Sequence, residues 1–177
     1  MALITEIRTL AKPDYEALDI SDPEADAVDS EALEDARAHV VASSGYHVYV
    51  HSLQRDIKVE VVIRVWDGPQ PTPGQSVSGF VRLALESENG VLMVNQFTSG
   101  PAGEMSLPRP GVYEGYASWS GREEVVAYRD SVVRQLTSDW SVEDMRQAWE
   151  RCPVPERYVL DLWYVRESSA GDEDDEL

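Results

Sequence analysis

The chain has 177 residues, a net charge of -18 at pH 7 and a hydrophobic content of 42%. The length suffices for one domain with its own core. The charge excludes direct binding to DNA or RNA, because such binding depends on cationic contacts to phosphates. The single cysteine, Cys152, excludes an internal disulfide and is typical of a reducing cytoplasm. No segment has the roughly 18 consecutive apolar residues that cross a membrane.

The negative charge is concentrated near both ends of the chain. Residues 14–36 carry ten carboxylates and no lysine or arginine, and residues 172–176 carry five more. This density of acids, interrupted by Pro13 and Pro23, predicts an acidic, flexible leader over residues 1–29. An acidic flexible tail is predicted over residues 168–177.

A short helix is predicted from about Ser30 to Ala38. Ser30 is the expected N-terminal cap, and acidic residues in the first turns suit the positive end of a helix. An acidic surface attracts a basic protein. The candidate partner-binding carboxylates are therefore Asp29, Glu31, Glu34 and Asp35.

Alternation of apolar and polar residues predicts half-buried β-strands through much of the remaining chain. The expected strands span residues 46–53, 56–66, 77–87, 90–98, 111–119 and 157–165. Asn89-Gly90 predicts a hairpin between the third and fourth of these. The proline-rich segment 67–74 and the segment 99–105 are predicted to be loops.

Two helices interrupt the β pattern. Apolar residues recur at helical spacing over residues 122–136 and 141–151, and Ser141 with Asp144 resembles a capping box. About seven short strands with a two-helix insertion before the last one indicate a mainly β, α+β fold. We expect an antiparallel β-sandwich in a single domain over residues 30–167, with the insertion at about 122–152.

The sequence predicts no catalytic residue, metal site or cofactor. His47 and His51 share a strand face but would lie roughly 13 Å apart, too far to bind one metal ion. Cys152 lacks the base and the low-pKa surroundings of a nucleophile. Tryptophan is enriched at protein interfaces, and Trp66, beside the proline-rich loop, and Trp140, between the helices, are the candidate partner anchors.

Several segments resemble the competence protein J group of small bacterial β proteins. They are SGYHVYVHS at 44–52, ENGVLMVNQF at 88–97 and MSLPRPGVYEGYASW at 105–119. The segment ERYVLDLWYVRE at 156–167 is similar to the closing strand of many uncharacterised small bacterial proteins. The resemblance covers residues 43–166. It implies a protein that binds a partner, because the competence member inhibits a DNA-entry nuclease, and it transfers no catalytic residue.

These observations predict a non-enzymatic, cytoplasmic bacterial protein that binds another protein. The specific form of this prediction is an inhibitor or immunity-type protein that acts on a basic partner, such as a nuclease or a toxin. A self-assembling, regulatory or structural module that docks through the helical insertion is an alternative, and an enzyme of unrecognised type is another. The sequence leaves the oligomeric state open.

Overall fold

The computed structural model describes residues 1–169, which form two five-stranded sheets, three α-helices and one short 3-10 helix. Sheet A has the order β1-β5-β10-β9-β6, and sheet B has the order β3-β4-β2-β7-β8. The strands are β1 (Leu3–Ala11), β2 (Ala17–Ser21), β3 (Val41–Ser43), β4 (His47–His51), β5 (Val59–Trp66), β6 (Gly79–Ser87), β7 (Val91–Gln96), β8 (Gly100–Ser106), β9 (Gly111–Ser120) and β10 (Arg157–Arg166). The helices are η1 (Asp14–Glu16), α1 (Ser30–His39), α2 (Arg122–Gln135) and α3 (Val142–Glu150).

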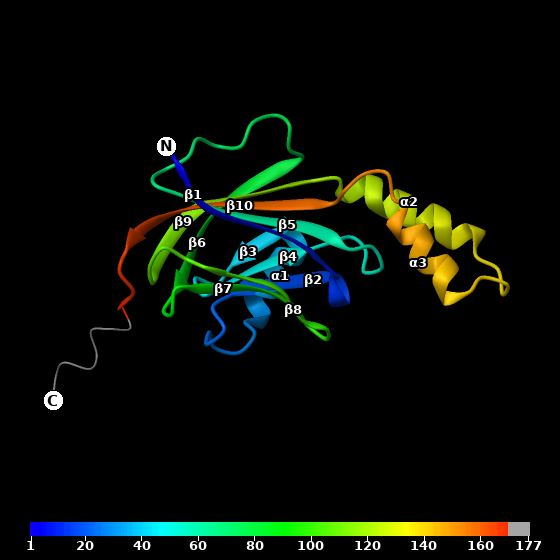
Figure 1. The fold of residues 1–177 in the computed structure, drawn as a ribbon, viewed down its shortest axis with the longest axis horizontal. Helices are drawn as coiled ribbons and strands as arrows, with labels where there is room; N and C mark the ends of the chain where they lie inside the picture. The colour runs from blue at the N-terminus through cyan, green and yellow to red at the C-terminus, as the bar shows by residue number, and fades with distance from the viewer. Residues whose placement is uncertain (170–177) are drawn as a thin grey trace.

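One hydrophobic core fills the space between the two sheets. Alternate residues of β5, from Val59 to Val65, face it from sheet A, and Leu18 and Ile20 of β2 face it from sheet B; all are fully buried. The prediction of a mainly β, α+β fold with two helices before the last strand is therefore confirmed. Figure 1 shows α2 and α3 projecting from one end of the β body.

The strand arrangement differs from a purely antiparallel sandwich. The pairs β1·β5, β10·β9 and β6·β9 are antiparallel, but β10 runs parallel to β5, from Arg157 beside Glu60 to Trp163 beside Trp66. Neighbouring edges of the two sheets are tied together. Ser43 Oγ donates to the Ala84 carbonyl at 2.6 Å, and Thr9 Oγ1 donates to the Ala102 carbonyl at 2.7 Å. These ties protect the edge strands, which would otherwise expose unpaired backbone groups.

Residues 3–21 belong to the fold, whereas the sequence predicted a flexible leader there. β1 pairs with β5 along its length, and β2 is the central strand of sheet B with all five residues buried. The density of acids predicted a flexible leader, but specific hydrogen-bond donors elsewhere in the chain bind these acids. Asp14 accepts from the Thr98 hydroxyl at 2.7 Å, and Asp19 lies 2.9 Å from His47 Nδ1.

Segment 99–105 is also different from its prediction, since β8 occupies residues 100–106 and pairs with β7. The predicted helices are confirmed as α1, α2 and α3, and the capping box of Ser141 and Asp144 is present. Asp29, rather than Ser30, caps α1 by accepting from the Ala32 N–H at 3.0 Å.

Residues 170–177 of the predicted tail lie outside the described residues. None of the helices within residues 1–169 is long and apolar enough to cross a membrane.

A buried carboxylate fastens the helical insertion to the β body. Glu156, between α3 and β10, is 1% exposed. It accepts hydrogen bonds from the Ser52 hydroxyl at 2.6 Å, the Gln54 amide at 2.9 Å and the Tyr158 hydroxyl at 2.5 Å. Burial, together with the Glu156 charge, raises the pKa of Tyr158 and keeps that hydroxyl a donor. The base of the insertion is thus held at a defined place on the body.

Candidate functional site: an acidic pocket between the two sheets

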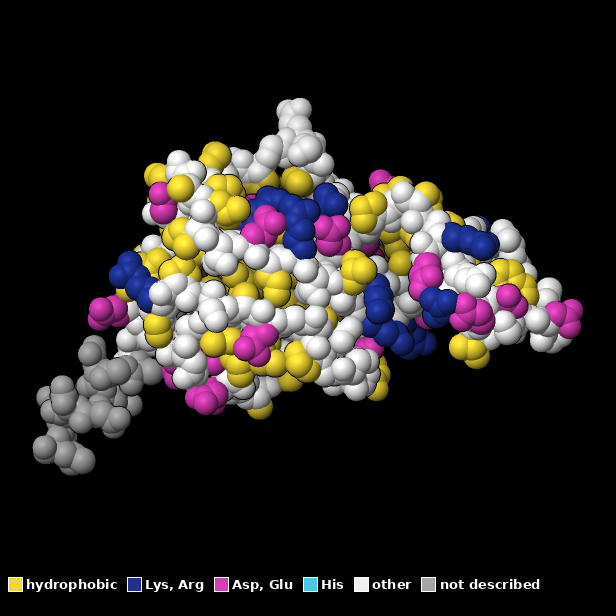
Figure 2. All heavy atoms as spheres, in the orientation of Figure 1, with side chains coloured by type: hydrophobic (Ala, Val, Ile, Leu, Met, Phe, Trp, Pro, Cys, Tyr) yellow, Lys and Arg dark blue, Asp and Glu magenta, His cyan; other side chains and the backbone are white. Residues whose placement is uncertain are grey.

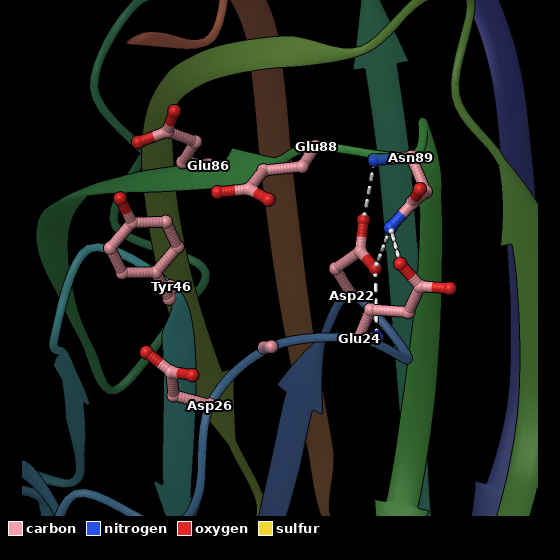
Figure 3. Close-up of a pocket in the computed structure, with 8 residues that line it drawn as sticks. Asp22, Glu24, Asp26, Tyr46, Glu86, Glu88 and Asn89 are labelled. Carbon is pink, nitrogen blue, oxygen red and sulfur yellow. Dashed lines mark hydrogen bonds between the residues drawn. The ribbon is translucent and has the colours of Figure 1, made fainter. Parts of the chain in front are cut away.

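A small pocket of about 140 Å³ opens where connections from both sheets meet. The β2–α1 loop, the turn before β4, and the end of β6 with the following hairpin form its walls (Figure 3). Five carboxylates line it, together with Tyr46 and Asn89. The acids are Asp22, Glu24, Asp26, Glu86 and Glu88.

Asp22 is the structural centre of the pocket wall. It is 4% exposed and accepts hydrogen bonds from the Ser87 hydroxyl at 2.6 Å, the Asn89 N–H at 2.9 Å and the Asn89 side-chain amide at 3.0 Å. Burial alone would raise the pKa of Asp22. The donors outweigh burial, and the pKa lies below its ordinary value. Asp22 is therefore an ionised anchor that joins the β2–α1 loop to the β6–β7 hairpin.

The opposite wall carries Glu86 and Tyr46. Glu86 is 8% exposed and accepts from the Ser168 hydroxyl and from the Ser169 N–H, the latter at 3.2 Å. The Glu86 charge, followed by burial, raises the pKa of the neighbouring Tyr46 hydroxyl. The phenol therefore stays protonated and remains a hydrogen-bond donor on the rim of the pocket.

Two buried aromatic side chains hold the loop that carries the pocket acids. His47 Nδ1 faces the Asp19 carboxylate at 2.9 Å, and its Nε2 lies 2.7 Å from the Asp26 carbonyl oxygen. Burial raises the pKa of Asp19, and the hydrogen bond from His47 opposes this effect. Tyr49 stacks on His47 and accepts from the Asp29 N–H at 2.9 Å. The loop from Asp22 to Asp29 is therefore pinned at several points along its length.

The pocket holds negative charge without internal compensation. No lysine or arginine within residues 1–169 forms an ion pair with any of the five pocket carboxylates. The described part of the chain also has no group of three or more His, Cys, Asp or Glu placed to hold a metal ion. The arrangement suits an organic cation, such as a guanidinium or ammonium group, which several spread carboxylates can contact at once.

The sequence matches no family model and no curated protein. Two solved structures match nearly the whole chain. One is ComJ from Bacillus subtilis, inhibitor of the DNA degrading activity of NucA, with a TM-score of 0.55, 9% identity and coverage of 93% of this chain and 98% of ComJ. The chain has a ComJ-like fold.

The second match is the product of crocagin biosynthetic gene J, with a TM-score of 0.55 and 13% identity. It covers 94% of this chain and 100% of that one. Both matches cover more of the chain than the segment 43–166 on which the resemblance rested. The ComJ-like fold confirms the resemblance to the competence protein J group. At these identities the likeness concerns the fold alone.

Within the ComJ-like fold, the predicted site residues lie in three places. Glu31, Glu34 and Asp35 are exposed on α1, directly after the pocket loop, while Asp29 is the cap of that helix. Trp66 ends β5, and its Nε1 donates to Asp161 at 2.8 Å. Trp140 lies in the connection between α2 and α3. The structure therefore brings the four acids together and leaves the two tryptophans apart from them.

The sequence did not identify the pocket acids as one site, because they lie in segments with different predicted structures. Asp22, Glu24 and Asp26 lay in the predicted leader, and Glu86 and Glu88 lay on a predicted strand and its hairpin. The density of acids before α1 was the one available signal. Their convergence depends on contacts between residues about 65 positions apart, as for Ser87 and Asp22.

An Asp22→Asn substitution tests the anchoring role. The amide would place a donor where the carboxylate accepts, so we expect a loss of about 1–3 kcal/mol in the free energy of unfolding at pH 7. Because the folded-state pKa of Asp22 is depressed, its stabilisation is present above the ordinary value of 3.8 and is lost as the pH falls through the folded-state pKa. The difference between wild type and variant in urea unfolding should therefore shrink below about pH 4. A difference that stays constant from pH 7 to pH 2 would contradict an ionised anchor.

Proposed function

We propose that this protein is a non-enzymatic inhibitor that binds a basic protein, such as a nuclease or a toxin. The ComJ-like fold carries the proposal. ComJ is an inhibitor of the DNA degrading activity of NucA, and the likeness extends over 93% of this chain and 98% of ComJ. An inhibitor of this kind acts by occupying a surface of its partner and needs no reaction centre of its own.

The acidic pocket is the proposed point of contact. A cationic side chain of the partner would enter it and meet Glu24, Asp26 and Glu88, whose carboxylates form no ion pair with a lysine or arginine of residues 1–169. Hydrogen bonds between an ionised donor and a carboxylate are among the strong ones in proteins. Clefts of proteins that bind DNA are rich in arginine and lysine, so the pocket complements the kind of surface that a nuclease inhibitor has to cover.

The exposed acids of α1 extend this surface. Glu31 and Asp35 follow the pocket loop, and Glu34 faces Arg37 at 3.6 Å in an exposed pair of small energetic value. Charges at the rim of an interface raise the association rate more than they raise affinity. We therefore propose that α1 steers the basic partner and that the pocket holds it.

Capture from an extract of the native cell tests the proposal. The immobilised protein should retain a basic protein at low salt, identified by mass spectrometry, and the added protein should slow DNA degradation or toxin activity by that partner. A variant with Glu24→Gln, Asp26→Asn and Glu88→Gln should bind it roughly tenfold more weakly or worse, with a shallower dependence on salt. Asp22 and Glu86 are left unchanged because they are buried.

The matched control removes the same charge from another surface. Glu123→Gln, Glu124→Gln and Asp139→Asn alter three exposed acids of the helical insertion. We expect this variant to retain the partner and the inhibition. Equal weakening by both triple variants would show a general charge effect and would remove the pocket from the proposal. A captured partner whose activity is unaffected would refute inhibition.

A further inference from the structure

An apolar groove lies between the helical insertion and the adjoining end of sheet A. It has a volume of about 470 Å³ and is lined by Leu10 at the end of β1, Ile57 before β5, Trp149 of α3, and Val154 with Pro155 before β10. Leu10 is 61% exposed and Val154 is 38% exposed. Exposed apolar side chains that gather in a hollow are characteristic of an interaction site.

Cations without carboxylate partners border this groove. Lys58 lines it, and Lys12 and Arg55 line an adjoining hollow that shares Asp56 with it. None of the three forms an ion pair with a carboxylate of residues 1–169. Figure 2 shows Lys and Arg side chains gathered where the β body meets the insertion. Asp56 and Glu150 also line the groove, but they pair with Arg129 and Arg146. Asp14 of the adjoining hollow accepts from the Thr98 hydroxyl. On a protein of net charge -18, the charges of this rim that form no ion pair within residues 1–169 are therefore mainly positive.

We infer that the groove binds the acidic C-terminal segment, residues 170–177, of a second copy of this chain. The segment reads AGDEDDEL and combines five acidic side chains with a leucine at position 177. The acids complement the rim of Lys12, Arg55 and Lys58, and the Leu177 side chain suits the apolar floor. The proposal is independent of the acidic pocket and of any basic partner.

The length of β10 places the segment out of reach of its own groove. β10 begins at Arg157, beside the groove, and runs ten residues away to Arg166, about 30 Å at the usual rise of a strand. Figure 1 shows the end of β10 and the α2–α3 insertion at opposite ends of the molecule. Counted from Ser169, which is bonded to Glu86, the chain extends at most about 29 Å to Leu177, and its last acid, Glu176, lies at most about 25 Å away. The acids of the segment therefore fall short of the rim of their own groove, and contact through them requires a second molecule.

Such a contact is head-to-tail, because the groove and the segment are different surfaces. Repetition of a head-to-tail contact produces a ring or an open chain of molecules rather than a two-fold dimer. An eight-residue segment buries a small area, so the association should be weak and concentration-dependent. Salt should weaken it further, because its charges are exposed.

Variants that reverse the charge of the groove or of the segment test the inference. Their association is measured by sedimentation velocity over a range of protein concentration. The wild type should show a rising mass at about 0.05 M salt that is lost at about 0.5 M. A groove variant with Arg55→Glu and Lys58→Glu, and a tail variant with Asp174→Lys and Asp175→Lys, should each associate roughly tenfold more weakly or worse. Mixing the two variants should restore association, since each supplies the surface that complements the other.

Two further measurements complete the test. Arg37→Glu with Arg134→Glu makes the same change of charge at exposed sites outside the groove and should leave association unchanged. A synthetic peptide of residues 168–177 should slow the reaction of Cys152, which also lines the groove, with a thiol reagent. A wild type that stays monomeric at every concentration at low salt would overturn the inference. So would a mixture of the two variants that fails to associate. Peptide binding without self-association would assign the groove to an acidic segment of another protein instead.

Discussion

The Glu156→Ala substitution is expected to lower the free energy of unfolding by about 3–5 kcal/mol. Glu156 is 1% exposed, and its carboxylate accepts from Ser52, Gln54 and Tyr158. Alanine would remove the carboxylate acceptor shared by three buried donors and would open a cavity at the base of the insertion. Urea unfolding at pH 7, followed by circular dichroism and tryptophan fluorescence, measures the loss.

Two controls separate the buried network from a general effect of charge. Glu156→Gln keeps the shape and one acceptor oxygen, so its loss should be smaller than that of the alanine variant. Glu124→Ala removes an exposed acid from the first turn of α2, and its effect should stay within about 0.5 kcal/mol. If the Glu156→Ala and Glu124→Ala variants unfold at the same urea concentration, the network does not fasten the insertion.

The Gly121→Val substitution should be similarly damaging, with a loss of about 3 kcal/mol or more. Gly121 joins β9 to α2 with φ of +78°, a conformation that a β-branched residue rarely adopts. A Cβ atom there would lie 2.1 Å from the Pro155 carbonyl oxygen, so the two ends of the insertion would be forced apart. Thermal and urea unfolding would record the loss. The apolar groove includes Pro155, and self-association should weaken as well.

Gly74→Val is the matched control in the proline-rich loop. A Cβ atom at Gly74 meets nothing within 4 Å, and its backbone is not in the left-handed region. This variant should unfold within about 0.5 kcal/mol of the wild type. A Gly121→Val variant as stable as the Gly74→Val variant would show that the junction of β9, α2 and β10 can relax without cost.

Local patterns predicted the elements whose stability depends on near neighbours. The alternating β-branched residues from Val59 to Val65 form β5, and the Asn89-Gly90 hairpin joins β6 to β7. The capping box at Ser141 begins α3. Each of these signals lies within a few consecutive residues, so the local sequence is enough to predict the element.

The same local reasoning failed where distant donors satisfy the charges. Asp14 and Asp19 looked like solvated acids of a leader, but Thr98 and His47 bind them within the folded body. β8 was missed for a related reason, because Gly100 and Pro101 predict a loop until the pairing of β8 with β7 is known.

By itself the sequence determined the mainly β character, the two-helix insertion, the absence of catalytic patterns and the two acidic regions. Periodicity and charge are properties of neighbouring residues, so they can be recognised without knowledge of the fold. Only the tertiary structure decided that Asp22 and Asp26 face Glu86 and Glu88 across a pocket, and that Lys58 borders a groove at the far end of β10 from Ser169. These placements depend on strand order and on the parallel pairing of β5 with β10. Both bring together residues that are far apart in the chain, so no short segment of the sequence predicts them.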